Sequence, residues 1–408
     1  MVDLRISRTD LALLLPEEDP DEVENIFASI AWNVICEPGD GFAGLLVSAL
    51  GPAVALEAEL SKLSVSTVRQ RVFESATDGT AADDFGVFEK RLLEARERWR
   101  SRLSLDLVRN ALYGIRKVKG TVLTPLSGSW PSQLSDLGFH APMALWLKGS
   151  EQSLQMLEQS IAVVGSRGST SYGEFATDLM ISSLVPKGLS IVSGGAYGID
   201  AAAHKSTLAL QGNTVAVMAG GVDRFYPSGN SSLLKRISET GAVISELPPG
   251  ATPTKWRFLQ RNRLIAALSQ STLVCEANWR SGALNTVSHC ERLERNVYAV
   301  PGPVTSPKSA GTNKLIADGR AQLVIDGKDL LDRMGIQQRV VTAAELAGLG
   351  AIETRVLDAL GFNSLEISEI CTEAGLTRDE ARFGLGNLEL DGLVVRRGMA
   401  WTKAQTTL

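Results

Sequence analysis

Two turns rich in small residues are the parts of this sequence best suited to bind an anion. The turn GSRG at 165–168 follows one apolar run, and the turn SGGA at 193–196 follows the next. Glycines let backbone N–H groups approach an anion closely, and the start of a helix adds unpaired N–H donors and a positive dipole end. Two such turns, with Arg167 in the first, predict a phosphate-binding edge. The open alternative is that the glycines only permit tight strand-to-helix turns.

Two later loops extend this pattern. The loop RSG at 280–282 follows the apolar run at 271–277, so we expect it to lie beside the first two turns. Asn313 and Lys314, which precede another helix, are a fourth candidate contact. None of these is the dinucleotide-binding fingerprint, because the glycine spacing after Gly165 differs and no acidic residue closes the second strand.

A run of cations and aromatic residues is the other candidate for a nucleic-acid contact. Residues 255–263, KWRFLQRNR, carry four positive charges and no acid. Single-strand binding sites combine cations that follow the backbone with rings that stack on bases. The alternative is that the aromatic residues anchor the core and that one arginine pairs with Glu246 or Glu276. We expect both in part, with Arg261 and Arg263 at the site and the phenyl ring of the run inside the core.

Seven apolar runs separated by helix-compatible stretches predict the sheet that positions these residues. Continuous apolar strands joined by helices indicate a parallel, doubly wound α/β sheet, in which ligands bind beyond the carboxyl ends of the strands. The expected strands are 161–166, 189–194, 214–220, 242–247, 271–277, 296–302 and 322–326.

Changes in composition along the chain predict its domains. We expect a helical N-terminal domain over 1–115, the α/β core over 121–332, a linker over 333–350 and a winged helix over 351–408. A winged helix binds either duplex DNA or protein. Because the third helix of this one mixes arginines with acids, the choice stays open.

Charge and composition exclude several classes of protein. The net charge of −5 argues against coating nucleic acid by bulk positive charge, although residues 121–330 hold 18 Lys or Arg against 15 Asp or Glu. The four cysteines and three histidines have no metal-ligand spacing, so we expect no metal, no cofactor and no catalytic residue. The chain has no apolar run of about 18 residues and starts with charged residues, which predicts a cytoplasmic protein without a membrane partner.

Several motifs occur in an order that resembles a known family. They span residues 161–324, and WPSQLSDLG and APMALWLKG resemble the segment before them. The motifs are VGSR (164–167), SGGAYGID (193–200), AAAH (201–204), FYP (225–227) followed by Asn230, RNRLIAALS (261–269), Glu276 with RSGAL (280–284), PG (301–302) and GTNKLI (311–316). Together they resemble the DprA/Smf family of DNA-processing proteins.

The resemblance implies both a fold and a function. The fold is an extended Rossmann-like domain with a helical N-terminal domain and a C-terminal winged helix. The implied function is to bind single-stranded DNA and deliver it to the RecA recombinase in natural transformation or recombination, without catalysis. A homodimer is compatible with this function. In this family the GSR arginine, here Arg167, belongs to the DNA pocket. Many members carry a lysine directly after FYP, where this chain has Ser228.

Residues and resemblance together give a set of expected DNA contacts. Tyr197 is included although it either stacks a base or caps the core. The set is Ser166, Arg167, Ser193, Gly194, Gly195, Tyr197, Asn230, Lys255, Arg257, Arg261, Asn262, Arg263, Arg280, Ser281, Gly282, Asn313 and Lys314.

Two other functions compete with DNA binding. The same Rossmann-like core resembles nucleotide-processing enzymes of the LOG/lysine-decarboxylase-like phosphoribohydrolase type, whose PGGxGTxxE motif supplies a catalytic glutamate. This chain has no such run, because SGGAYGID and RSGALNT lack a glutamate at that spacing. The other reading is an interaction scaffold, for which the cation–aromatic run at 255–263 would be incidental.

Overall fold

The computed structural model describes Leu15 and residues 22–75, 85–336, 349–361, 364–398 and 400–403. The chain divides into two compact units, Met1–Gly327 and Lys328–Leu408, and each is described by itself. Most of the predicted linker at 333–350, the first part of the helical domain and the polar stretch at 76–84 lie outside the described residues. The domain boundaries given by the sequence therefore stay predictions.

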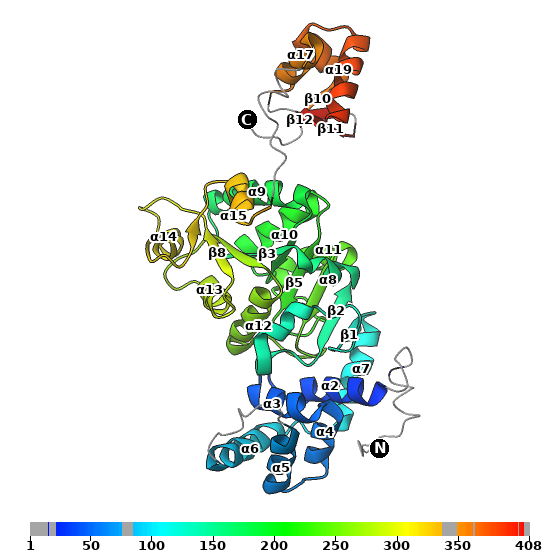
Figure 1. Ribbon diagram of the computed structural model, residues 1–408, viewed down its shortest axis with the longest axis vertical. Coiled ribbons are helices and arrows are strands. Elements are labelled where there is room, and N and C mark those ends of the chain that lie inside the picture. Colours follow the sequence, from blue (N-terminus) through cyan, green and yellow to red (C-terminus); the bar gives the residue numbers. More distant parts are fainter. Residues whose placement is uncertain are drawn as a thin grey trace. The chain divides into compact units, whose positions relative to one another are not determined.

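A nine-stranded sheet forms the centre of the first unit (Figure 1). Its strand order is β1-β2-β6-β5-β4-β3-β7-β8-β9, and β3 to β9 run parallel to one another. The seven predicted strands are confirmed as β3 (Ser160–Gly165), β4 (Ser190–Ser193), β5 (Thr214–Met218), β6 (Ala242–Ser245), β7 (Ser271–Glu276), β8 (Asn296–Ala299) and β9 (Gln322–Leu323).

Two strands that the sequence did not predict extend the sheet beyond β6. The strands β1 (Thr121–Leu123) and β2 (Leu145–Gly149) are antiparallel to their neighbours, so the sheet is mixed. They come from a segment with three prolines and no clear period. The indole ring of Trp146 in β2 is fully buried, which secures this edge of the sheet.

Helices cover both faces of the sheet. The helices α9 (Ser171–Leu184), α10 (Ile199–Ala209) and α11 (Ser231–Thr240) pack side by side on one face, while α12 (Lys255–Ala267) and α13 (Ala283–Arg292) pack on the other (Figure 1). After β6 the chain reverses direction and places β7 beside β3. This reversal is the topological switch point, where open α/β sheets bind ligands. The remaining helices of the core are η2 (Ser132–His140), α8 (Gln152–Gln155), η3 (Met156–Glu158), η4 (Val185–Lys187), η5 (Ser228–Asn230) and α14 (Ala310–Ala317).

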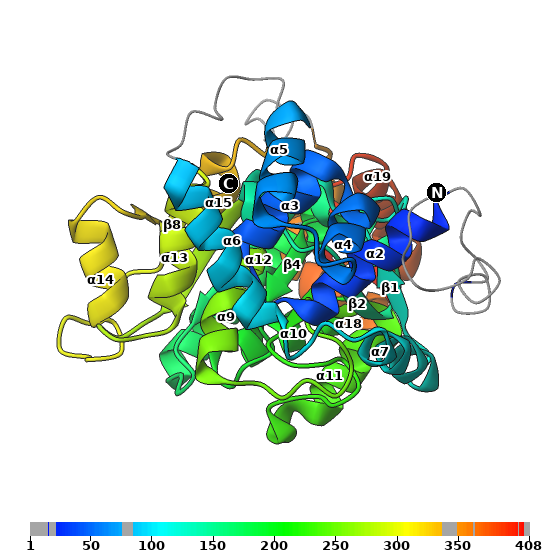
Figure 2. The same cartoon turned by 90° about the horizontal axis from the view of Figure 1, so that it is seen from below.

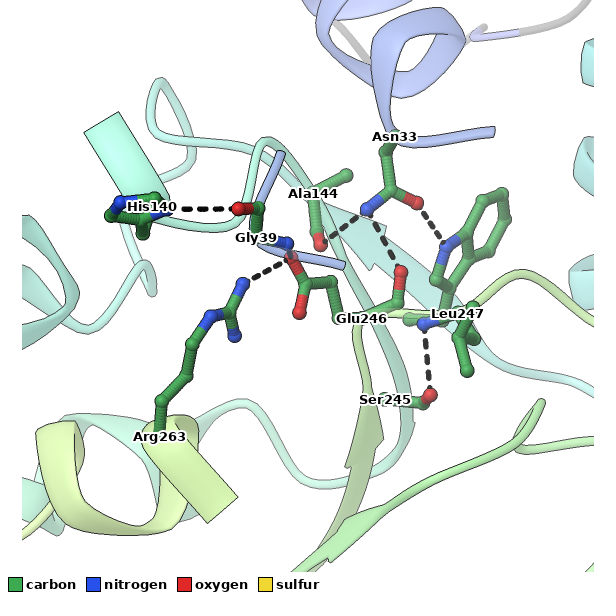
Figure 3. Close-up of polar contacts among 9 residues, drawn as sticks. Asn33, Gly39, His140, Ala144, Ser245, Glu246, Leu247 and Arg263 are labelled. Atoms are coloured by element: carbon green, nitrogen blue, oxygen red, sulfur yellow. Dashed lines mark hydrogen bonds and ion pairs between the residues drawn. The ribbon is translucent and has the colours of Figure 1, made fainter. Parts of the chain in front are cut away.

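The N-terminal helices are attached to the sheet by buried polar contacts. Asn33 donates to the carbonyl oxygens of Ala144 (3.2 Å) and Glu246 (2.8 Å), and its own side-chain oxygen accepts from the indole of Trp146 at 2.8 Å (Figure 3). Because Glu246 directly follows β6, these contacts hold the helices against the carboxyl end of that strand. The helices are α2 (Val23–Ile35), α3 (Gly41–Leu50), α4 (Pro52–Leu60), α5 (Val65–Ser75), α6 (Phe85–Trp99) and α7 (Leu105–Lys117), and Figure 2 shows them from below.

The second unit contains a winged helix. Its sheet has the order β10-β12-β11, and its apolar core is formed mainly by three helices. Its elements are α15 (Gly327–Arg333), which begins on the last residue of the first unit, α17 (Ala351–Leu360), β10 (Leu365–Glu366), α18 (Ile367–Ala374), α19 (Arg378–Leu390), β11 (Val394–Arg397) and β12 (Ala400–Lys403). Within the described ranges of both units, no single helix is long and apolar enough to cross a bilayer. Among the described helices, only the pair α3 and α4, taken together across their 112° bend, meets that length and composition.

A buried histidine makes the stability of this fold depend on pH. His204 in α10 is fully buried, and its Nδ1 lies 2.7 Å from the hydroxyl of Thr214 in β5. Burial, and to a smaller extent the nearby charge of Arg261, lowers the pKa of His204 to about 3. The folded protein therefore keeps this ring neutral between pH 6.5 and about 3, whereas the unfolded chain binds a proton below pH 6.5.

We predict that the His204→Asn variant loses less stability in acid than the wild type does. Above pH 6.5 the two should have parallel profiles, because the ring is neutral in both the folded and the unfolded state. Between pH 7.5 and 5 the free energy of unfolding of the wild type should fall by about 2 kcal/mol more than that of the variant. Urea unfolding at several pH values measures this difference. Parallel profiles down to pH 5 would contradict the assignment.

Candidate functional site

Three turns meet at the carboxyl edge of the sheet, as expected from the sequence. Since β3 lies between β4 and β7, the turns that follow these strands are neighbours. A cavity of about 60 Å³, here called the edge pocket, opens among them. Its lining includes Arg167, Asp200, Phe258, Arg261, Asn262 and Gly282. The fold thus brings together residues that lie more than 100 positions apart in the sequence.

The first turn presents Arg167 to solvent. The backbone of Ser166 is held on both sides, since its N–H donates to the carbonyl of Glu276 (2.7 Å) and its carbonyl accepts from Ile199 N–H (3.1 Å). The guanidinium carbon of Arg167 lies 4.8 Å from the ring centroid of Phe258. Among the described residues this side chain has no ion-pair partner, so a cation–π contact orients the charge without neutralising it. Arg167 is therefore available to an anion.

The second turn is constructed around the buried side chain of Arg261. One of its terminal nitrogens donates to the carbonyl of Gly194 at 2.7 Å and also to the carbonyl of Val217. A Cβ atom on Gly194 would lie 2.5 Å from this guanidinium, so the close approach requires glycine. Asp200 accepts from the N–H groups of Gly194 (3.1 Å) and Ala196 (3.4 Å). The N–H groups of Gly194 and Ala196 thus bind a carboxylate of the protein itself, and not an anion from solution as the sequence predicted.

Burial shifts the pKa values of both charged groups under this turn. Desolvation lowers the pKa of Arg261 to about 10, although Asp200 opposes this shift. Desolvation raises the pKa of Asp200, while Arg261 and the two backbone N–H groups oppose that shift. Arg261 stays protonated at neutral pH because its pKa is well above 7. Both arginines line the edge pocket, but the charge of Arg261 faces the Asp200 carboxylate, whereas Arg167 has no ion-pair partner among the described residues.

The hydroxyl and amide groups predicted near these turns also have internal partners. The hydroxyl of Ser193 donates to the carbonyl of Val163 at 2.6 Å, which links β4 to β3. The side-chain nitrogen of Asn262 donates to Asn285 (3.1 Å) and to the carbonyl of Gly282 (3.4 Å). These groups set the shape of the pocket wall.

Two exposed aromatic rings, those of Tyr226 and Tyr197, belong to segments near Phe258 and the first turn. The rings of Tyr226 and Phe258 have centroids 5.9 Å apart, and Tyr226 is 46% exposed. Tyr197 is 47% exposed, and its hydroxyl accepts from Gly229 N–H at 3.2 Å. We call Arg167, Tyr197, Tyr226 and Phe258 the cation–aromatic surface.

Sequence reasoning identified this surface only in part. It expected Phe258 inside the core, but the ring is half-buried beneath Arg167. It did not select Tyr226, although the motif FYP at 225–227 was the available signal. Ser228, at the position where many family members have a lysine, is exposed next to this motif. Asn230 is buried and donates to the carbonyls of Gly195 and Ala196, both at 3.0 Å.

The structure places several predicted contacts away from the edge pocket. Arg263 pairs with Glu246 at 2.6 Å on the opposite side of α12. Arg257 pairs with Glu37 of the helical domain at 2.7 Å. In the remaining loops, both side-chain atoms of Asn313 bind the backbone of Gly302 (3.1 and 3.0 Å), and Lys314 pairs with Asp318 at 2.5 Å. Lys255 and Arg280 are exposed, and the hydroxyl of Ser281 accepts from Ala283 N–H at 3.3 Å.

The acids near the site are occupied by structural contacts. Both carboxylate oxygens of Glu276 accept from Thr170, one from its hydroxyl (2.6 Å) and one from its N–H (2.9 Å), at the start of α9. In the part of the chain that the structure describes, no group of three His, Cys, Asp or Glu side chains could hold a metal ion. The arrangement is therefore suited to binding an anion next to exposed rings.

The fold and comparisons with known proteins together identify the family of this chain. A Rossmann-like core with a candidate anion site at the switch point, followed by a winged helix, defines the class of protein. The family model of the DNA recombination-mediator protein A matches residues 121–335, and the model of the DprA winged helix domain matches residues 341–398. The chain belongs to the DNA recombination-mediator protein A family, which confirms the resemblance to DprA/Smf proteins.

Individual relatives agree with the family assignment. A Mycobacterium tuberculosis relative described as a DNA processing protein DprA is 38% identical over 317 residues, which cover 74% of this chain and 81% of the relative. The DNA processing protein DprA of Streptococcus pneumoniae is 40% identical over 206 residues, which cover 50% and 71%. The X-ray structure of the S. pneumoniae protein matches 71% of this chain and 92% of its own with a TM-score of 0.53 and 31% identity.

The close packing at Gly194 gives a test of whether the guanidinium of Arg261 is fixed in place. We predict that Gly194→Ala destabilises the protein by about 1–3 kcal/mol, because the new methyl group collides with a guanidinium that is fixed to two carbonyls. The matched control is Gly168→Ala in the first turn, where a Cβ atom would meet only the flexible end of Lys308, at 3.0 Å. Urea unfolding of both variants measures the difference. Equal stabilities would show that Arg261 is not fixed as described.

Proposed function

We propose that this protein binds single-stranded DNA at the edge pocket and delivers it to a RecA-type recombinase in transformation or recombination. The observation that carries the proposal is Arg167, an exposed guanidinium without an ion-pair partner among the described residues, which rests on Phe258 at the switch point of the sheet. A guanidinium binds a phosphate oxygen pair through two parallel N–H donors. The buried Arg261 behind it, whose charge is compensated by Asp200, holds the second turn in place beside this contact.

The exposed rings favour a single strand over a duplex. The exposed rings of Tyr197 and Tyr226, the latter packed against Phe258, offer faces on which bases can stack. Bases in a duplex must first be unstacked and unpaired, whereas those of a single strand are accessible. Binding rather than catalysis fits the acids of the site, since Asp200 and Glu276 are both used to hold turns.

Delivery to a recombinase is the finer part of the proposal. It is supported by membership of a recombination-mediator family and by the likeness to the DNA processing protein of S. pneumoniae. Such a protein would act in the cytoplasm. In the proposal the winged helix is free to contact a partner, because its described charges are mixed and the cation–aromatic surface lies wholly in the first unit.

The first test compares single and double strands and removes one charge. An unstructured oligo-dT should bind more tightly than blunt duplex of equal length. The Arg167→Ala variant should weaken single-strand binding and flatten the plot of log affinity against log salt by about 0.7, which corresponds to one phosphate. Lys187→Ala, which removes an exposed charge just before β4 at the opposite edge, is the control and should leave the slope unchanged. Equal affinity for both DNA forms, or an unchanged slope for Arg167→Ala, would contradict the proposal.

The second test separates the core from the winged helix. A truncation after Gly335 should keep most of the single-strand affinity, because the cation–aromatic surface lies in the first unit. Circular dichroism first confirms that the truncated protein is folded, and oligo-dT titrations then compare it with the full chain. A folded truncation that binds more than about tenfold more weakly, a loss of roughly 1.4 kcal/mol, would move the DNA site to the winged helix.

A further inference from the structure

A second and larger cavity lies on the other side of α12. It has a volume of about 810 Å³, within the range of pockets that hold small organic ligands, and we call it the α12 groove. It is enclosed by α6 of the helical domain, the loop at 37–41, and the helices α12 and α13 of the core. All of these belong to the first unit of the chain. None of the functional residues assigned to the edge pocket lines it.

The wall of the groove contains a buried cation with unused donors. The side chain of Arg263 is only 4% exposed, and one terminal nitrogen pairs with Glu246 at 2.6 Å (Figure 3). Its Nε and its other terminal nitrogen are buried and make no hydrogen bond within the described part of the chain. Leaving such donors unsatisfied is costly, and an anion in the groove would satisfy them.

Further cations of the groove lack acidic partners. Arg292 in α13 is exposed and forms no ion pair with the described residues. Arg91 in α6 lies 5.6 Å from the ring centroid of Phe42 and likewise forms no ion pair with the described residues. The pKa of His289 is lowered to about 4, by burial first and then by the charges of Arg292 and Arg263. The two arginines thus contribute the smaller part of this shift, after burial.

Most acids of the groove are neutralised by other arginines. Glu37 is bound by Arg257 and Arg102, Asp136 by Arg295 at 2.5 Å, and Asp40 by Arg98 at 3.4 Å. Only Glu94 lines the groove without a described partner. The groove therefore attracts an anion despite its acidic residues.

An exposed indole lies in the same groove. Trp256 is 58% exposed, and Leu137 and Leu293 add apolar surface to the lining. Phosphate-binding cations beside an exposed flat ring match a ligand that has both a phosphate and an aromatic base. A nucleotide combines these two parts.

The helix α12 connects the groove to the edge pocket. Trp256, Gln260 and Arg263 are spaced at i, i+4 and i+7 and line the groove, while Phe258 and Arg261 line the edge pocket on the opposite face. Leu259 is exposed and lines the edge pocket, and Lys255 is exposed four residues before it on the same helix. A strand that leaves the edge pocket has only to cross one helix, about 10–12 Å wide, past an unpaired lysine to reach the groove.

We propose that the α12 groove is a second nucleotide subsite for the same single strand, with a phosphate on Arg263 and Arg292 and a base against Trp256. The proposal rests on the function proposed above, because the strand enters the groove from the edge pocket. It predicts that only oligonucleotides long enough to cross α12 engage the groove.

The test combines two groove variants with two lengths of oligo-dT. Arg292→Ala and Trp256→Ala change exposed side chains and leave the pair between Arg263 and Glu246 intact. Both should weaken binding of an oligo-dT of about 16 nucleotides by about fivefold or more and leave one of about 5 nucleotides unaffected. Lys187→Ala and Tyr113→Ala, which remove an exposed charge and an exposed ring elsewhere, should bind both lengths like the wild type.

The outcomes separate this proposal from the one it rests on. If Arg167→Ala weakens both lengths while the groove variants bind both like the wild type, the groove is wrong and the edge pocket stands. If the groove variants weaken the short oligonucleotide equally, they act at the edge pocket and the groove is again wrong. If wild-type protein binds neither length, both proposals fail. A last titration measures the binding of free dTMP to wild type and Arg292→Ala. If the variant loses dTMP binding but binds both oligonucleotides like the wild type, the groove is a site for a free nucleotide and the proposal is wrong.

Discussion

The carboxyl edge of the sheet depends on the buried side chain of Arg261. Its guanidinium joins α12 to the carbonyls that follow β4 and end β5, next to the carboxylate of Asp200. A charge is expensive to bury unless hydrogen bonds and an opposite charge compensate it, and both are present here. This contact fixes the position of α12 against the sheet. It thereby fixes Phe258, on which Arg167 rests.

The three arginines of α12 have different structural roles. Arg257 and Arg263 bind Glu37 and Glu246 and so attach the helix to the helical domain and to the end of β6. Arg261 organises the second turn. The charge offered to a ligand at the edge pocket therefore comes from Arg167. The three arginines of α12 hold the surrounding structure in place and do not contact the ligand there.

Much of the fold could be predicted because long apolar runs alternate with helical stretches. The strands β1 and β2 were missed, since each is short and antiparallel and lies in a proline-containing segment without a period. The sequence could identify the turns and the cation-rich run but not the side of α12 on which each arginine lies. For Arg257 the side is set by its partner Glu37, which lies 220 positions away in the sequence. No local pattern reveals such a distant partner. Tyr226 was missed for a similar reason, because its neighbour Phe258 comes from another part of the chain.

The most direct test of the central claim is to map where a single strand touches the protein. Oligo-dT that carries 5-iodouracil can be cross-linked to the full-length protein by light, and the modified residues can be identified by mass spectrometry. The account predicts cross-links at Tyr226 or Tyr197, the exposed rings beside Arg167. Cross-links confined to the winged helix, for example at Trp401, would contradict a DNA site at the carboxyl edge of the sheet.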